Sequence, residues 1–227
     1  MDANWSGQPR KLLLHANRNG FLYVLDRTSG KLLLAKPLVK KLTWASGIDS
    51  NGRPILLPNQ VPTPAGVKIC PPIEGATNWF STAFIPETGL YYVQTLEKCG
   101  IFTKSSSEWK AGTSFMGGTT RNIPDDNSRK ILRAYDIHTG EIVWELPQFG
   151  DAESWGGVLG TAGGLVFFGD DDGSLAAADA RTGKRLWSFQ ASRLWKASPM
   201  TYRFDGQQYV AVATGQSVIS FGLPASR

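Results

Sequence analysis

The chain has 227 residues and a formal net charge of +5, and 41% of its residues are apolar, enough for one large domain or two small ones. No run approaches the ~18 consecutive apolar residues of a membrane-spanning helix. The basic residues are scattered, with only three lysines in the densest cluster, 36–41, so the charge does not predict a nucleic-acid surface.

The first residues show no signal-peptide pattern. Met1 is followed by Asp2, Ala3 and Asn4, without a basic stretch or an apolar run. A strand-like run follows almost at once, at residues 11–15. Since an intact secreted protein would not begin in this way, we expect the chain to be part of a longer protein.

Short apolar runs bounded by turn residues predict strands along most of the chain. Amphipathic helical periodicity is hard to find. Segment 103–128 is polar and predicts a long surface loop, a kind of segment that often borders a functional site. In chain order, the predicted strands are 11–15, 21–26, 79–85, 90–95, 165–169, 174–179, 198–204, 208–214 and 217–221.

One pattern occurs twice, at residues 134–144 and 177–187, with an offset of 43 residues (177 − 134). A weaker third copy covers residues 24–30, with Leu34 at the Trp position. A repeat of this length matches one four-stranded blade of a β-propeller, and we count about four blades. The shared pairs are Ala134/Ala177, Asp136/Asp179, Thr139/Thr182, Gly140/Gly183 and Trp144/Trp187.

The repeated residue types predict a hairpin. The Asp that ends the first strand can accept backbone N–H bonds in the following turn. The Gly four residues later supplies the positive φ that closes the hairpin. The next strand then carries a Trp with a large apolar surface. A single copy would fit any hairpin with a buried Trp, but two copies in register predict repeated blades.

Several separated stretches resemble signature regions of the methanol/ethanol dehydrogenase family that uses pyrroloquinoline quinone (PQQ). The resemblance runs from about Lys11 to Leu223. It implies an all-β fold of four-stranded antiparallel blades, in which residues 1–227 form the C-terminal part of an eight-bladed propeller domain. It also implies a periplasmic oxidation of primary alcohols to aldehydes, with electrons passed to a c-type cytochrome. The matching stretches are 17–28, 75–79, 155–169, 198–202 and 208–212.

The resemblance assigns cofactor-binding roles to four residues. Arg18 matches the basic residue facing the quinone oxygens of PQQ, where a fixed cation stabilises developing negative charge and acts in catalysis. Asn78 matches a residue that hydrogen-bonds the cofactor. Trp155 matches a Trp whose neighbourhood touches PQQ, and Gly156 with Gly157 would let backbone approach the flat cofactor. From local sequence alone, Arg18 would be an exposed turn residue and Trp155 a core residue.

No metal ligand is predicted in this chain. In the family, the ligands of Ca²⁺ or a lanthanide and the catalytic Asp lie before the stretch that contains Arg18, in N-terminal blades that this chain does not match. The acidic run Asp170 to Asp172 is interpreted as a solvated hairpin turn. Residues 157–164 are rich in Gly but are followed by a strand, which argues against a dinucleotide-binding loop.

The resemblance also implies a disulfide between Cys70 and Cys99. They are the only cysteines, 29 positions apart (99 − 70), and the family pairs cysteines at matching places. A disulfide implies an oxidising compartment for the parent protein.

Three functions stay open from the sequence. The leading hypothesis is the alcohol dehydrogenase. The rivals are a non-catalytic propeller scaffold and a PQQ-dependent sugar or polyvinyl alcohol dehydrogenase. The blade repeats cannot separate these, whereas Arg18, Asn78 and Trp155 together favour the enzyme and are predicted to face one central site.

Overall fold

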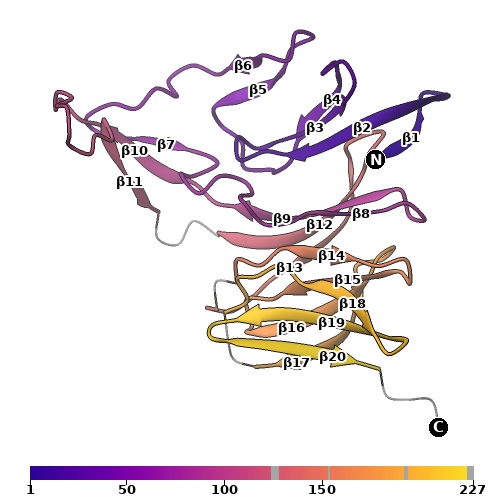
Figure 1. The fold of residues 1–227 in the computed structure, drawn as a ribbon. Coiled ribbons are helices and arrows are strands. Elements are labelled where there is room, and N and C mark those ends of the chain that lie inside the picture. Colours follow the sequence, from indigo (N-terminus) through magenta and orange to yellow (C-terminus); the bar gives the residue numbers. More distant parts are fainter. Residues whose placement is uncertain (124–127, 153, 192–193, 224–227) are drawn as a thin grey trace. The chain divides into compact units, whose positions relative to one another are not determined.

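The fold is described from a computed structural model, for residues 1–123, 128–152, 154–191 and 194–223 (Figure 1). Within these ranges the chain forms strands β1 to β20 and no helix. The chain divides into two compact units, and each is described by itself. Unit 1 contains Met1–Asn78, Thr95–Arg129 and His138–Gly140, and unit 2 contains Trp79–Gln94, Lys130–Ile137 and Glu141–Arg227.

Unit 1 contains a four-stranded antiparallel sheet in the order β1-β2-β3-β4. The predicted strand 21–26 is confirmed as β3, and its Phe21, Leu22 and Val24 are fully buried. The strands are β1 (Asp2–Trp5), β2 (Gln8–Ala16), β3 (Phe21–Asp26) and β4 (Leu32–Pro37). Two smaller sheets contain β5 (Ala45–Ile48) with β6 (Pro54–Leu56), and β11 (Gly118–Asn122) with β10 (Gly100–Lys104) and β7 (Val67–Ile69).

The prediction of one long loop over 103–128 was wrong in part. Strand β10 extends to Lys104, and β11 pairs with it in an antiparallel ladder. The hydroxyl groups of Thr103 and Thr119 lie 2.6 Å apart across this pair. The strands were missed because their exposed polar residues lack the apolar alternation that marks a half-buried strand.

Unit 2 contains three sheets, of which two have four strands. The first has the order β13-β12-β9-β8, the second β14-β15-β16-β17, and the third β18-β19-β20. The strands of the first sheet are β8 (Ala83–Ile85), β9 (Leu90–Glu97, whose last residues belong to unit 1), β12 (Arg129–Asp136) and β13 (Ile142–Pro147). The others are β14 (Val158–Gly160), β15 (Leu165–Gly169), β16 (Ser174–Asp179), β17 (Arg185–Gln190), β18 (Met200–Phe204), β19 (Gln207–Thr214) and β20 (Ser217–Gly222).

In the second sheet of unit 2, strands β15 and β16 bury side chains on both faces, whereas β17 is exposed. On one face, alternate residues such as Val166, Phe168 and Ala176 join a core with the first sheet. On the other face, Leu175 packs with Val212 of the third sheet in a second buried cluster. Because successive side chains of a strand point to opposite faces, one strand can serve two cores. Four-stranded sheets stacked in this way are the blades that the repeat predicted.

The repeated turns have the predicted geometry. Gly30, Gly140 and Gly183 have φ values of 72°, 72° and 71°, in the left-handed region. The carboxylate of Asp179 accepts the backbone N–H of Arg181 at 3.0 Å and of Thr182 at 2.8 Å. Asp26 accepts equivalent bonds in its own turn. The Asp and Gly therefore hold the hairpins at Asp26 and Asp179 closed.

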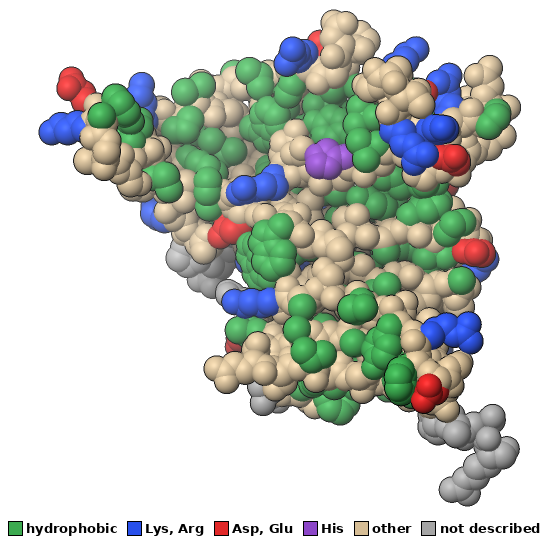
Figure 2. Space-filling model, in the orientation of Figure 1, with side chains coloured by type: hydrophobic (Ala, Val, Ile, Leu, Met, Phe, Trp, Pro, Cys, Tyr) green, Lys and Arg blue, Asp and Glu red, His purple; other side chains and the backbone are tan. Residues whose placement is uncertain are grey.

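The surface is mixed in charge. Figure 2 shows Lys and Arg side chains scattered over the visible face without a single basic stripe. Among the residues described, no helix is long and apolar enough to cross a membrane.

Candidate functional site

A pair of glycines after Trp155 lets other parts of unit 2 approach closely. A methyl group on Gly156 would lie 2.8 Å from the carbonyl oxygen of Ala197, and one on Gly157 would lie 2.5 Å from the backbone nitrogen of Ser81. Both distances are too short for a side chain. The glycines therefore make room for protein, whereas the sequence had suggested room for a cofactor; contact of Gly156 with a cofactor stays a prediction.

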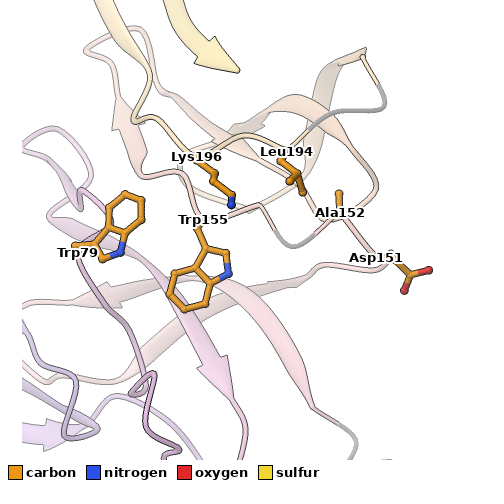
Figure 3. Close-up of a pocket in the computed structure, with 6 residues that line it drawn as sticks. All are labelled: Trp79, Asp151, Ala152, Trp155, Leu194 and Lys196. Atoms are coloured by element: carbon orange, nitrogen blue, oxygen red, sulfur yellow. The ribbon is translucent and has the colours of Figure 1, made fainter. Parts of the chain in front are cut away.

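A pocket with a volume of about 410 Å³ lies beside Trp155 (Figure 3). The indole of Trp79 is 63% exposed and forms part of the wall. The buried ring of Phe80 lies edge-on to Trp155, with 5.2 Å between ring centroids, and contacts Trp79 at 5.8 Å. The pocket is lined by Trp79, Asp151, Ala152, Trp155, Leu194 and Lys196.

Polar groups fix the backbone immediately before Trp155. Ser154 donates its N–H to the carboxylate of Asp171 at 2.9 Å, and its hydroxyl donates to the carbonyl oxygen of Asp170 at 2.9 Å. The same Asp171 carboxylate pairs with the Lys130 ammonium at 2.5 Å, and the Lys130 side chain is only 5% exposed. Because Ser154 is hydrogen-bonded to this buried ion pair, its backbone has little conformational freedom. The backbone from which Trp155 projects toward the pocket is therefore fixed.

The acidic run 170–172 is a hairpin turn, as predicted, but it is not simply solvated. Arg185 pairs with Asp170 at 3.1 Å and with Asp172 at 2.9 Å. Burial raises the pKa of the Asp170 carboxyl, and the neighbouring Asp172 charge adds to this effect. The carboxylates are therefore engaged by cations of the same unit. Among the residues described, no group of three or more His, Cys, Asp or Glu is placed to hold a metal ion.

Arg18, in the turn between β2 and β3, packs against the segment 73–78 of unit 1 that ends at Asn78, although 60 positions separate the two residues (78 − 18). The Arg18 guanidinium donates to the carbonyl oxygen of Ile73, and the Arg18 carbonyl accepts the N–H of Ala76 at 3.0 Å. The Asn78 side-chain amide donates to the Glu74 carbonyl at 2.7 Å. The structure thus brings these two predicted residues to the same segment, 73–78.

Gly75 explains why this loop can pack against Arg18. Its φ is +87°, and a methyl group there would lie 2.7 Å from the Arg18 Cβ. A larger residue would be both strained and blocked. That Arg18 and Asn78 face one site together with Trp155 stays a prediction.

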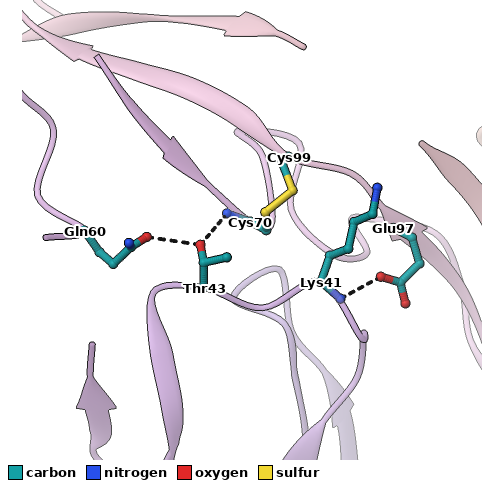
Figure 4. Close-up of a disulfide and its surroundings, with 6 residues drawn as sticks. All are labelled: Lys41, Thr43, Gln60, Cys70, Glu97 and Cys99. Carbon is teal, nitrogen blue, oxygen red and sulfur yellow. Dashed lines mark hydrogen bonds between the residues drawn. A yellow bond between two sulfur atoms is a disulfide. The ribbon is translucent and has the colours of Figure 1, made fainter. Parts of the chain in front are cut away.

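The predicted disulfide between Cys70 and Cys99 is confirmed, with Cα atoms 4.3 Å apart (Figure 4). Thr43 and Cys70 exchange two hydrogen bonds, at 2.9 and 3.0 Å. The Glu97 carboxylate accepts the backbone N–H groups of Lys40 and Lys41, each at 2.8 Å. The disulfide therefore joins Cys70 to the segment that contains Cys99, and the Glu97 carboxylate joins this same segment to residues 40–41 of unit 1.

Sequence reasoning missed Lys196. Its place in the pocket depends on the close approach of segment 195–197 to Gly156, which links residues 40 positions apart (196 − 156) and leaves no local pattern. Trp79, the last residue of the matching stretch 75–79, also lies in the pocket wall.

Comparison with known proteins gives matches along nearly the whole chain. A PQQ β-propeller domain of glucose/ethanol/alcohol dehydrogenases matches residues 146–210. The quinoprotein alcohol dehydrogenase PedH of Pseudomonas putida is 39% identical over 217 residues, which cover 92% of this chain and 36% of PedH.

Two solved structures have similar folds. The quinohemoprotein alcohol dehydrogenase of Comamonas testosteroni has a TM-score of 0.86 and 32% identity, and the match covers 96% of this chain and 34% of that chain. A europium-containing methanol dehydrogenase has a TM-score of 0.83 and 36% identity, and the match covers 93% of this chain and 38% of that chain. The chain thus spans about a third of the length of the relatives that it matches.

Proposed function

Because this chain belongs to the PQQ-dependent alcohol dehydrogenase family, we propose that it supplies part of the PQQ pocket of an enzyme that oxidises primary alcohols to aldehydes. The observation that carries this proposal is the pocket beside Trp155. Its volume of about 410 Å³ lies in the range of small-molecule sites. Two indoles in its wall suit a flat aromatic ligand, and the Lys196 cation suits an anionic one.

PQQ, when bound, supplies an electrophilic quinone that accepts the hydride equivalent of the alcohol. The residues of this chain would bind and orient it. Trp155 and Trp79 offer flat apolar surfaces, and the packing behind Trp155 keeps its position fixed. Arg18 would place a permanent cation beside an oxygen that gains negative charge, and Asn78 would donate a hydrogen bond from its amide.

The rest of the catalytic apparatus is proposed to lie outside these 227 residues. This includes the ligands of Ca²⁺ or a lanthanide, the base that accepts the alcohol proton, and further N-terminal blades. We also propose a c-type cytochrome as electron acceptor and a periplasmic location. The Cys70–Cys99 disulfide supports an oxidising compartment.

The test is a titration of the purified chain with PQQ and Ca²⁺, followed by the absorbance of the bound cofactor. We expect binding that Trp155→Ala abolishes, because the flat wall is lost. Trp109→Ala is the control, since Trp109 is 66% exposed on a loop of unit 1. Equal binding by both variants, after circular dichroism shows that both are folded, would contradict the proposal.

A second measurement concerns turnover. With ethanol, PQQ and Ca²⁺ in a dye-linked assay, we expect no oxidation by the isolated chain, because it offers a cation and a pocket wall but no assigned base or metal ligand. Turnover that disappears in Arg18→Ala would show instead that the chain forms a complete site.

A further inference from the structure

Segment 194–197 is held on several sides within unit 2. The Trp195 side chain is completely buried, donates from its indole nitrogen to the Gly173 carbonyl at 3.1 Å, and packs on Gly169. The Trp195 backbone N–H donates to the Ser154 hydroxyl at 3.3 Å. The Leu194 carbonyl accepts the Thr214 hydroxyl at 3.0 Å. This segment is therefore a fixed part of the pocket wall.

The fixed backbone determines where Lys196 points. The Trp195 side chain is directed into the core, whereas its neighbour Lys196 is exposed. The carbonyl groups of Trp195 and Ala197, on either side of Lys196, both rest on Gly156, one residue from Trp155. Figure 3 shows Lys196 extending toward the Trp155 side of the pocket.

The charges around the pocket favour an anion. Over the described parts of the chain, Lys196 forms no ion pair. The other charged residue of the lining is Asp151, and Figure 3 shows its carboxylate directed away from the two indole rings. The ligand therefore meets one cation beside two flat apolar surfaces.

We infer that Lys196 binds a carboxylate group of a flat aromatic ligand that stacks on Trp79 and Trp155. This inference rests on the proposed function, and it adds a binding residue to that pocket. A charge-assisted hydrogen bond from an ammonium to a carboxylate is about twice as strong as a neutral one. The carboxylate belongs either to the cofactor, since PQQ carries three, or to an acidic aromatic alcohol used as substrate.

The first arm of the test measures the dissociation constant of PQQ for the full chain by calorimetric titration. We expect Lys196→Gln to weaken binding about tenfold and Lys196→Arg to retain most of it, because only the first variant removes the charge. The trimethyl ester of PQQ, which lacks carboxylates, should bind the chain and Lys196→Gln equally. Lys184→Gln, on an exposed turn of the same unit, is the matched control and should change nothing.

The second arm compares 4-(hydroxymethyl)benzoate with benzyl alcohol. If Lys196→Gln weakens binding of 4-(hydroxymethyl)benzoate but leaves binding of benzyl alcohol and of PQQ unchanged, the carboxylate that Lys196 binds belongs to the substrate. Unchanged binding of both PQQ and the benzoate in Lys196→Gln would overturn the inference, and the proposed function would stand if Trp155→Ala still lost PQQ. If the chain itself binds no PQQ, the proposed function fails, and the benzoate titration alone decides the role of Lys196.

Discussion

Trp144 and Trp187 occupy the same place in two copies of one repeat, yet their surroundings differ. Trp144 is 8% exposed, and its indole nitrogen donates to the Ala180 carbonyl at 3.0 Å. Trp187 is 39% exposed, and its ring lies edge-on to Phe221 at 5.2 Å and to Phe167 at 6.5 Å. The repeat therefore specifies the residue type, but it does not specify the burial of the side chain.

The burial of Trp144 comes from the turn that covers it. The Gly183 turn lies directly on Trp144, since a methyl group on Gly183 would be 2.6 Å from the indole ring. In unit 1, the Gly140 turn covers Leu34 in the same way, since a methyl group on Gly140 would lie 3.1 Å from the Leu34 side chain. The repeated Gly thus has two roles: its positive φ closes its own hairpin, and its lack of a side chain admits the large residue of the preceding copy.

The largest expected effect comes from truncating the two tryptophans. Trp144→Ala should lower the free energy of unfolding by about 3–5 kcal/mol, because it leaves a cavity in a closed core. Trp187→Ala should cost about 1 kcal/mol, because much of its surface already faces solvent. Urea unfolding monitored by circular dichroism measures both. Equal losses would show that burial in the structure does not explain the difference between the copies.

The next effect tests the two roles of the turn glycine. Gly183→Ala combines backbone strain with contact against the Trp144 ring and should cost about 2–4 kcal/mol. Gly164→Ala is the matched variant, because Gly164 has a φ of +79° but open space around it, and it should cost about 1 kcal/mol. If Gly164→Ala destabilised the protein as much as Gly183→Ala, close packing on Trp144 would not be the second role.

The sequence predicted the strands whose apolar residues alternate or run continuously. Residues 21–26 and 165–169 form strands with the predicted bounds, since β-branched and aromatic residues there face cores. The predicted strand 79–85 begins only at Ala83. The residues before Ala83 lie against the segment of Gly157 instead, since the Ser81 carbonyl accepts the N–H of Val158 at 2.9 Å.

The candidate site was less predictable than the strands. The resemblance selected Trp155, and the structure places it in a pocket. Lys196 was missed because its role depends on which backbone segments meet at Gly156, a contact between distant parts of the sequence. The sequence analysis explained Gly156 by close approach of the backbone to the cofactor. In the structure, the close packing of Ala197 on Gly156 is a sufficient reason for a glycine at this position.

The smallest expected effect concerns the repeated Asp and depends on pH. The hydrogen bond from the Thr182 hydroxyl, followed by the Thr182 N–H, lowers the pKa of Asp179. In unit 1, bonds from Thr28 hold the pKa of Asp26 well below its usual range, and Arg10 adds to the effect from 3.0 Å. Since a carboxylate with a lowered pKa stabilises the fold only while it is ionised, this stabilisation is present above the usual Asp pKa and disappears as the pH falls.

Replacing each Asp with Asn separates charge from hydrogen bonding, because Asn keeps one acceptor oxygen. At pH 7 we expect Asp26→Asn to lower the melting temperature more than Asp179→Asn, since the pKa of Asp26 is lowered further and an ion pair is lost. Both differences from the unsubstituted chain should shrink as the pH falls from 5 toward 2, because the Asp carboxylates of the unfolded chain take up protons in this range, while those of the folded chain, with their lowered pKa values, take up fewer. Added salt should weaken the Asp26 effect more, because it screens the partly exposed pair with Arg10. Differences that stay constant over this pH range would show that the turns need only an acceptor oxygen, and that the charge of the repeated Asp contributes nothing.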